Sequence, residues 1–125
     1  MGGKGIKVIW AKIASVLMFI AVALGAFGSH ALRGKISDYY LEVYKTAALY
    51  HFIHALGLFV VAWLITATQN PKIGIAGIFM LAGIVLFSGS LYVLSVTGIK
   101  WLGAITPLGG LSFLAAWLIL FLNIK

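Results

Sequence analysis

The chain has 125 residues, of which 63% are hydrophobic and 9% are charged, and its mean hydropathy is +1.15. Soluble domains are about 45–50% apolar and about 25% charged, and a soluble chain of this length could not bury so much apolar surface in one core. The composition therefore excludes an ordinary soluble domain and predicts an integral membrane protein. The absence of cysteine excludes disulfides, thiolate catalysis and cysteine-ligated metals.

The formal net charge is +7, from nine Lys and Arg residues against Asp38 and Glu42. The cations stand singly at the ends of apolar segments and form no cluster or patch interleaved with aromatic residues. Such an arrangement is typical of interfacial anchors and topology signals and does not follow a phosphate backbone. We therefore expect the lipid bilayer as a partner and no nucleic acid.

Four apolar segments are long enough to cross a membrane, which takes roughly 20 helical residues. They cover residues 8–30, 46–67, 73–97 and 101–123. The sequence thus predicts an all-α fold, an antiparallel bundle of four transmembrane helices that forms a single transmembrane domain over residues 1–125. The four tryptophans fall mostly toward segment ends, as an interfacial aromatic belt would place them: Trp10, Trp63, Trp101 and Trp117.

The first connector, "RGKISDYYLEVYK", has helical spacing, whereas the other two connectors are tight turns. Ser37 can cap a helix, and Tyr40, Leu41 and Tyr44 would share one face of it. We expect about two or three turns that lie at the interface and run into the second span, a short interfacial helix before that span.

Four spans place both termini on one side of the membrane. The terminal side carries Lys4, Lys7, Lys12, Lys72 and Lys125, and the opposite side carries Arg33, Lys35, Lys45 and Lys100. Cytoplasmic loops carry the excess of Lys and Arg. This small excess favours termini in the cytoplasm.

The polar and glycine-rich motifs of all four spans fall in the same membrane half, the one that faces the first and third connectors. The other half is nearly pure Leu, Ile, Val, Ala and Phe. The motifs supply a candidate polar site: His30, Tyr50, His51, His54, Ser88, Ser90, Tyr92 and Thr106. They also supply candidate positions for helix packing or a kink: Gly25, Gly28, Gly89, Pro107, Gly109 and Gly110.

His51 and His54 stand three residues apart and would share a helix face. Ionisable groups inside a membrane are functional hypotheses by default. Three interpretations remain open: hydrogen bonds that hold the bundle together, proton or substrate chemistry, and a metal or haem site completed by His30. No carboxylate lies at a comparable depth, and four short, tightly turned spans leave little room for a haem. We favour the first interpretation and assign no metal and no cofactor.

Small residues recur every four positions at Ala21, Gly25 and Ser29, a pattern that brings membrane helices close together. In "ITPLGG", Pro107 removes one helical hydrogen bond, and the glycines that follow weaken the next turn. A kink is therefore expected in the fourth span.

Nothing in the chain matches a hydrolytic triad, a P-loop, a dinucleotide fingerprint or a calcium loop. A triad needs an acid to orient its histidine, and neither acid stands at the right depth. We therefore expect no enzyme, but a small structural or accessory membrane protein that acts as a homo-oligomer or within a larger membrane complex. The alternative is a protein that binds or transports a small molecule, a lipid or a proton at the candidate polar site. A haem or metal protein is a distant alternative.

Four motifs, in this order, carry a resemblance to a known family: "GAFGSHAL", "YHFIHALGL", "LFSGSLYVL" and "GAITPLGGLSFLAAW". Together they resemble the four-span family numbered 423 among domains of unknown function, which is related to animal transmembrane protein 256. The resemblance covers nearly the whole chain from about Leu17. It implies a protein of the bacterial cytoplasmic membrane without an established activity, and it assigns no catalytic or ligand-binding residue.

Overall fold

A computed structural model describes residues 2–125 of the chain; Met1 and the side chains of residues 2–4, which include the predicted cation Lys4, lie outside the described part. Helices make up nearly all of this part, in the order α1 (Gly2–Val22), η1 (Ala23–Gly28), α2 (Ser29–Leu32), α3 (Asp38–Thr68), α4 (Ile73–Gly83), η2 (Ile84–Gly89), α5 (Ser90–Thr97), η3 (Lys100–Ala104) and α6 (Thr106–Asn123). Of these, η1 and η2 are π-helical and η3 is a 3₁₀-helix.

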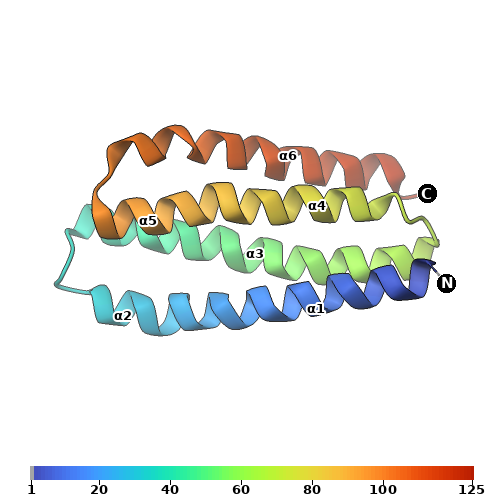
Figure 1. The fold of residues 1–125 in the computed structure, drawn as a ribbon, viewed down its shortest axis with the longest axis horizontal. Helices are drawn as coiled ribbons and strands as arrows, with labels where there is room; N and C mark the ends of the chain where they lie inside the picture. The colour runs from blue at the N-terminus through green and yellow to red at the C-terminus, as the bar shows by residue number, and fades with distance from the viewer. Residues whose placement is uncertain (1) are drawn as a thin grey trace.

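Four continuous helical stretches are long and apolar enough to cross a membrane: Gly5–Leu32, Asp38–Thr68, Ile73–Thr97 and Lys100–Asn123. The predicted all-α fold with four spans is confirmed. The helices run alternately up and down, so that both termini lie at one end of the molecule, while α2 and α5 lie at the other (Figure 1). The half near α2 and α5 is the half in which the sequence places the polar motifs.

The helical turns expected in the first connector are the beginning of α3. The hydroxyl oxygen of Ser37 accepts a hydrogen bond from the backbone N–H of Tyr40 at 3.1 Å, which caps the helix as its sequence predicts. From Asp38 the helix continues without a break to Thr68. The turns expected in the first connector and the second span therefore form one continuous helix.

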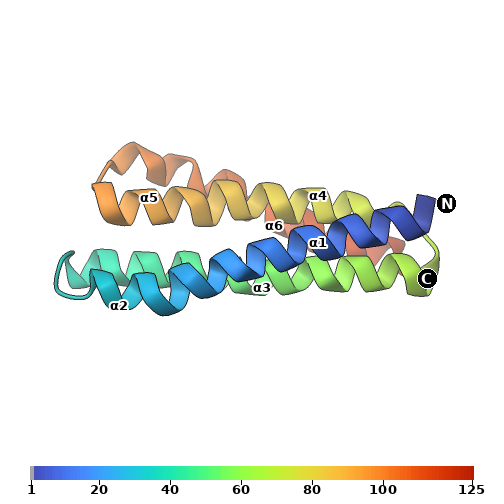
Figure 2. The ribbon, with the colours of Figure 1, turned by 60° about the horizontal axis from the view of Figure 1, so that its bottom comes forward.

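The central helix of the fold is α3, which packs against α1 on one side and against α4, η2 and α5 on the other. Helix α6 packs against α4 and η2. Figure 2 shows that α1 is inclined to its neighbours, so that its N-terminal part approaches α4. This order lets side chains of α3 meet α1, α5 and α6 at the end that holds the polar motifs.

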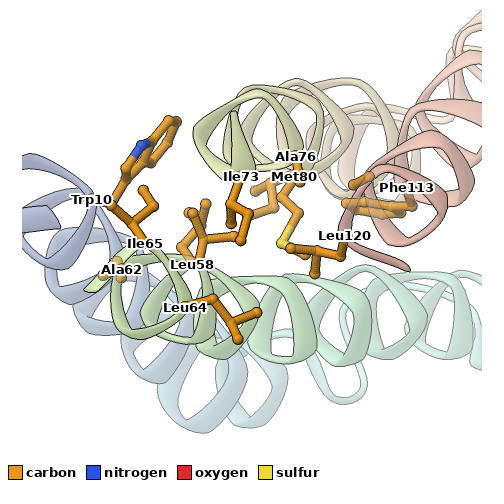
Figure 3. Close-up of a cluster of buried hydrophobic side chains, with 14 residues drawn as sticks. Trp10, Leu58, Ala62, Leu64, Ile65, Ile73, Ala76, Met80, Phe113 and Leu120 are labelled. Atoms are coloured by element: carbon orange, nitrogen blue, oxygen red, sulfur yellow. The ribbon is translucent and has the colours of Figure 1, made fainter. Parts of the chain in front are cut away.

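The apolar core connects α1, α3, α4 and α6, and Figure 3 shows its larger side chains. Aromatic and sulfur side chains lie over glycines of the neighbouring helix: Trp10 over Gly74 and Gly77, and Met80 over Gly57. Lipid offers no hydrophobic drive for helix association, so such close packing must hold the helices together. Trp10 is therefore a core residue, only 8% exposed, and does not belong to the predicted interfacial belt.

Two of the spans contain a π-helical segment at the motifs rich in small residues. Both η1 and η2 end in a glycine that a serine follows, Gly28–Ser29 and Gly89–Ser90. A π-helical turn takes backbone groups out of the regular α-helical ladder, and such turns are frequent at functional sites. In the fourth span, Pro107 stands in the first turn of α6, directly after η3. The span changes there from a 3₁₀-helix to an α-helix that has a proline in its first turn, and the expected kink stays a prediction.

Candidate functional site

The polar layer, as we call it, consists of the hydrogen-bonding side chains that cluster around η1 and η2 in the half near α2 and α5. Its members come from α3, η2, α5 and α6 and are Tyr44, His51, His54, Ser88, Ser90, Tyr92, Ser95, Thr106 and Trp117. Side chains that are far apart in the sequence meet here because α3 runs between the other helices.

His54 forms hydrogen bonds through both ring nitrogens, one within α3 and one that joins α3 to α6. Its Nδ1 lies 2.8 Å from the carbonyl oxygen of Tyr50, and its Nε2 lies 3.0 Å from the indole nitrogen of Trp117. The imidazole also stacks on the ring of Phe113, with the ring centroids 3.5 Å apart and the planes 8° from parallel. His54 is 3% exposed, so the bilayer does not compete for these contacts.

The partners of His54 fix its protonation state. A carbonyl oxygen only accepts a hydrogen bond and an indole nitrogen only donates one. Nδ1 must therefore carry the proton that it donates to Tyr50, and Nε2 must be the bare nitrogen that accepts from Trp117. The arrangement fits the neutral imidazole alone, and no nitrogen of this ring remains for a metal or a substrate.

His51 turns to a different neighbour, the α5 helix. Its Nδ1 lies 2.9 Å from the hydroxyl of Tyr92, whose ring in turn packs edge-on against that of Tyr44. Tyr44 donates its own hydroxyl proton to the carbonyl oxygen of Leu24 in η1, at 2.7 Å. Together, His51, Tyr92 and Tyr44 connect α5, α3 and η1 across the bundle.

The other ring nitrogen of His51 is the exception in the polar layer. Among the described residues, Nε2 of His51 is the one buried side-chain nitrogen or oxygen without a hydrogen-bond partner. A buried polar group without a partner is costly. The bond to the hydroxyl of Tyr92 is therefore the hydrogen bond that offsets the burial of the His51 ring.

We expect Tyr92→Phe to lower the free energy of unfolding by about 1 kcal/mol, since the change leaves both nitrogens of His51 without a partner. Thermal unfolding of the detergent-solubilised protein, followed by circular dichroism, measures the effect. Tyr39→Phe is the matched control, because Tyr39 is 70% exposed. Equal melting temperatures for the two variants would show that the His51–Tyr92 bond contributes no stability.

The hydroxyl groups of serine and threonine complete the polar layer with hydrogen bonds to backbone carbonyls and to each other. Ser88 donates to the carbonyl oxygen of Ala47 on α3 at 2.8 Å, and Ser90 donates to that of Phe87 at 3.0 Å. The hydroxyls of Ser90 and Thr106 lie 2.7 Å apart and join α5 to α6. Tyr44 and Ser90 thus bond to carbonyl oxygens of the two π-helical segments, that of Leu24 in η1 and that of Phe87 in η2.

Glycines make room for these contacts. A Cβ atom on Gly28 would overlap the hydroxyl of Tyr44, and one on Gly109 would overlap the backbone nitrogen of Phe87. A Cβ atom on Gly25 would lie 2.7 Å from the ring of Phe52. By contrast, a Cβ atom on Gly89 would lie 3.9 Å from the carbonyl oxygen of Ile84, and one on Gly110 would lie 3.9 Å from the ring of Phe87. Both distances are ordinary van der Waals contacts.

Two predicted members of the candidate site, His30 and Tyr50, form no side-chain hydrogen bond within the polar layer. His30 on α2 is exposed and takes no part in the polar layer through its side chain. Tyr50 is 37% exposed; it contributes its carbonyl to His54, while its ring packs on Phe87. Within residues 2–125, no group of three or more His, Cys, Asp or Glu side chains is placed to hold a metal ion. His30 is therefore not joined to the other histidines in the three-nitrogen set considered from the sequence.

Sequence reasoning missed four contributors: Tyr44, Ser95, Phe113 and Trp117. Tyr44 belonged to the expected interfacial helix and Trp117 to the expected aromatic belt, yet both bond inside the bundle. The buried Ser95 donates to the carbonyl of Tyr92. One signal in the sequence could have identified Trp117 as a residue of the bundle interior. It stands ten residues after Pro107 and therefore deeper in the membrane than the end of its span, where an interfacial tryptophan would lie.

An open groove lies beside His54, between α3 and α6. We call it the α3–α6 groove; its volume is about 570 Å³, and it is lined by Tyr50, His54, Phe87, Pro107, Gly110, Leu111, Phe113, Leu114 and Trp117. Aromatic rings supply most of one wall, and the polar atoms of His54 are already bonded to the protein. The groove thus offers an apolar, aromatic surface to the bilayer.

The chain is similar to membrane proteins of unknown function. The family model described as "Protein of unknown function (DUF423)" matches residues 24–110. The UPF0382 membrane protein YwdK of Bacillus subtilis is 54% identical over 109 residues, which cover 86% of this chain and 89% of that protein. A UPF0382 membrane protein of Staphylococcus haemolyticus is 43% identical over 111 residues, covering 89% of this chain and 90% of its relative. No solved structure matches the chain.

The names of these relatives describe membrane proteins and no activity. They agree with the four membrane-spanning helices of the fold and with the family that the four sequence motifs resemble. The relation to animal transmembrane protein 256 stays a prediction. The family model covers more than half of the chain and the Bacillus relative covers most of it. This chain is therefore a member of the DUF423 family, a four-span membrane protein.

Proposed function

We propose that this protein is a structural or accessory component of the bacterial cytoplasmic membrane and that its polar layer serves to hold its helices in register. The observation that carries the proposal is the complete use of both His54 nitrogens by Tyr50 and Trp117. General acid–base catalysis requires a group within hydrogen-bonding reach of the substrate. A histidine bonded on both sides inside the protein does not offer one.

The two carboxylates support the same proposal. Asp38 and Glu42 lie in the first turns of α3 and are exposed, and Glu42 lies 3.5 Å from the ammonium of Lys45. Neither acid orients a histidine of the polar layer, since the partners of His51 and His54 are a tyrosine hydroxyl, a carbonyl and an indole. The candidate polar site of the sequence is accordingly proposed as a set of structural contacts.

The partners of such a protein would bind its outer surfaces. Along most of its length α1 has α3 as its neighbour, and its apolar window is the least buried of the four spans. This leaves α1 open to lipid or to another membrane helix. We propose that residues 1–125 act as one transmembrane domain within a homo-oligomer or a larger membrane complex, without a nucleic-acid partner.

Native mass spectrometry of the full chain, extracted gently from bacterial membranes, tests this function. We expect a multiple of the chain mass, or the chain mass increased by that of a partner protein. A monomer that carries one small molecule other than a phospholipid at full occupancy would contradict the proposal and favour a binding protein.

The termini are proposed to lie in the cytoplasm, on the side that carries the excess of cations: Lys4, Lys7, Lys12, Lys72 and Lys125. An epitope tag attached after Lys125 should resist protease added outside intact bacterial protoplasts and should be cut once they are lysed. Digestion of the tag in intact protoplasts would reverse the orientation.

A second candidate function, the binding of an apolar ligand from the bilayer, is favoured by the α3–α6 groove. Its volume of about 570 Å³ lies within the usual range of small-molecule sites, and its lining is largely aromatic. Leu111→Trp would fill this groove from its exposed side. A ligand seated there should be lost from the purified variant and retained by the unaltered protein.

A further inference from the structure

A second groove in the same membrane half lies between α1 and α3, beside the π-helical segment η1. We call it the α1–α3 groove; its volume is about 480 Å³. Ser29 and Lys45 line its end nearest the first connector, and Gly25 and Phe52 line the end deeper in the membrane. The groove is therefore amphipathic along its length, with a cation at the interfacial end and apolar surface below it.

The deep end has the shape of a trough because its floor lacks large side chains. Gly25 and Ala48 form the bottom, and the ring of Phe52 forms a wall. The next residue of η1, Ala26, is exposed at the rim. A linear hydrocarbon chain fits such a trough, since it can lie along the helices over the small residues Ala26 and Ala48 and against the ring of Phe52.

The interfacial end has the chemistry of an anion site. The Lys45 side chain is 47% exposed, and its one ion-pair partner among the described residues is Glu42, at 3.5 Å with 74% of that side chain exposed. A pair this exposed contributes about 0–1 kcal/mol, so the ammonium can exchange it for a stronger anion. Arg33 and Lys35 add exposed positive charge on the connector immediately above.

We propose that the α1–α3 groove binds an anionic phospholipid, with the phosphate against Lys45 and one acyl chain along the trough over Ala26 and Ala48. This binding site is independent of the polar layer and of the accessory function proposed above. Basic pockets between transmembrane helices are typical sites for anionic headgroups, and each Lys or Arg near the surface contributes about 1 kcal/mol to that attraction. A single zwitterionic headgroup gains no such net attraction.

Lys45 and Glu42 have opposite charges on the same turn of α3, so removing one or the other should change lipid binding in opposite directions. Lys45→Gln removes the cation that holds the phosphate, whereas Glu42→Gln removes the carboxylate that competes for it. The first change should weaken binding of phosphatidylglycerol about fivefold, the factor that corresponds to about 1 kcal/mol. The second should strengthen it. Lys100→Gln is the matched control, because Lys100 is an exposed lysine of the same membrane half outside the groove.

Native mass spectrometry of the full chain in detergent, titrated with phosphatidylglycerol or with phosphatidylcholine of the same acyl chains, measures the binding. We expect the first bound lipid to be phosphatidylglycerol in clear preference to phosphatidylcholine, with the order of affinities Glu42→Gln above the unaltered chain and Lys45→Gln below it. Lys100→Gln should bind as the unaltered chain does.

The trough is tested separately by Ala26→Trp, which adds bulk at the exposed rim without entering the core. This variant should lose the high-affinity phosphatidylglycerol while its circular dichroism and melting temperature stay unchanged. Equal binding of the two lipids, or equal losses in Lys45→Gln and Lys100→Gln, would overturn the proposal. Full lipid binding by a folded Ala26→Trp variant would do so as well.

Discussion

Replacing Gly109 by alanine is expected to destabilise the protein by about 2 kcal/mol or more. The new Cβ atom would overlap the backbone nitrogen of Phe87 in η2, and its next neighbour, the Cα atom of Phe87, would lie 2.7 Å away. Overpacking costs about 1–3 kcal/mol even when flexible side chains can give way. Here the obstacle is backbone, so α6 must move away from η2, and the Ser90–Thr106 bond that joins α5 to α6 must lengthen.

The adjacent residue supplies a matched control. A Cβ atom on Gly110 would meet its nearest neighbour, Cδ2 of Phe87, at 3.9 Å, an ordinary van der Waals contact. Alanine also favours a helix over glycine by up to about 1 kcal/mol. In thermal unfolding in detergent, followed by tryptophan fluorescence, Gly110→Ala should therefore keep or raise the melting temperature that Gly109→Ala lowers. Equal losses in the two variants would show that helix α6 does not approach η2 this closely.

Much of the fold follows directly from the sequence. Apolar runs of about 20 residues have few structures open to them in lipid, because every backbone hydrogen bond must be made within the segment. The Ser37 cap was equally readable, since it depends on local residues alone. The depth of His51, Ser88 and Thr106 follows from their position along alternating helices.

What the sequence could not provide is the neighbour that each side chain meets. His51 and His54 share a helix face, yet one bonds to Tyr92 on α5 and the other to Trp117 on α6. That difference depends on the order in which the helices pack, which no local pattern encodes. His30 lies in the last turn of α2, beside the first connector, and its side chain is exposed rather than turned toward the other histidines.

The π-helical segments show the same limit. "ALGAFG" and "IVLFSG" contain small residues that make an irregular turn sterically possible. Small residues alone do not make such a turn more stable than a regular α-helix. In η1, the turn is stabilised by Tyr44, twenty residues away, which donates to the carbonyl of Leu24 and occupies the space above Gly28. Local propensity and a distant partner are both required, and the sequence displays only the first.

Replacing His54 by alanine is expected to cost about 2 kcal/mol of stability, because the change removes two kinds of contact. One is the stack on Phe113, and aromatic pairs contribute about 0.5–1.5 kcal/mol. The other is the bond from Trp117, and hydrogen bonds between membrane helices contribute about 0.6 kcal/mol on average. His54→Phe should lose less than His54→Ala, since a phenyl ring can keep the stack while it loses the bond.

The controls for this change decide whether the polar layer is structural. His30→Ala should leave the melting temperature unchanged, because that side chain is exposed. Trp117→Phe should cost stability in the unaltered protein and almost nothing further in His54→Phe, since the partner of the indole is then already gone. Additive losses in this double-mutant cycle would mean that the two side chains act independently. A melting temperature of His54→Ala equal to that of His30→Ala would remove the main support for a layer that holds α6 against α3.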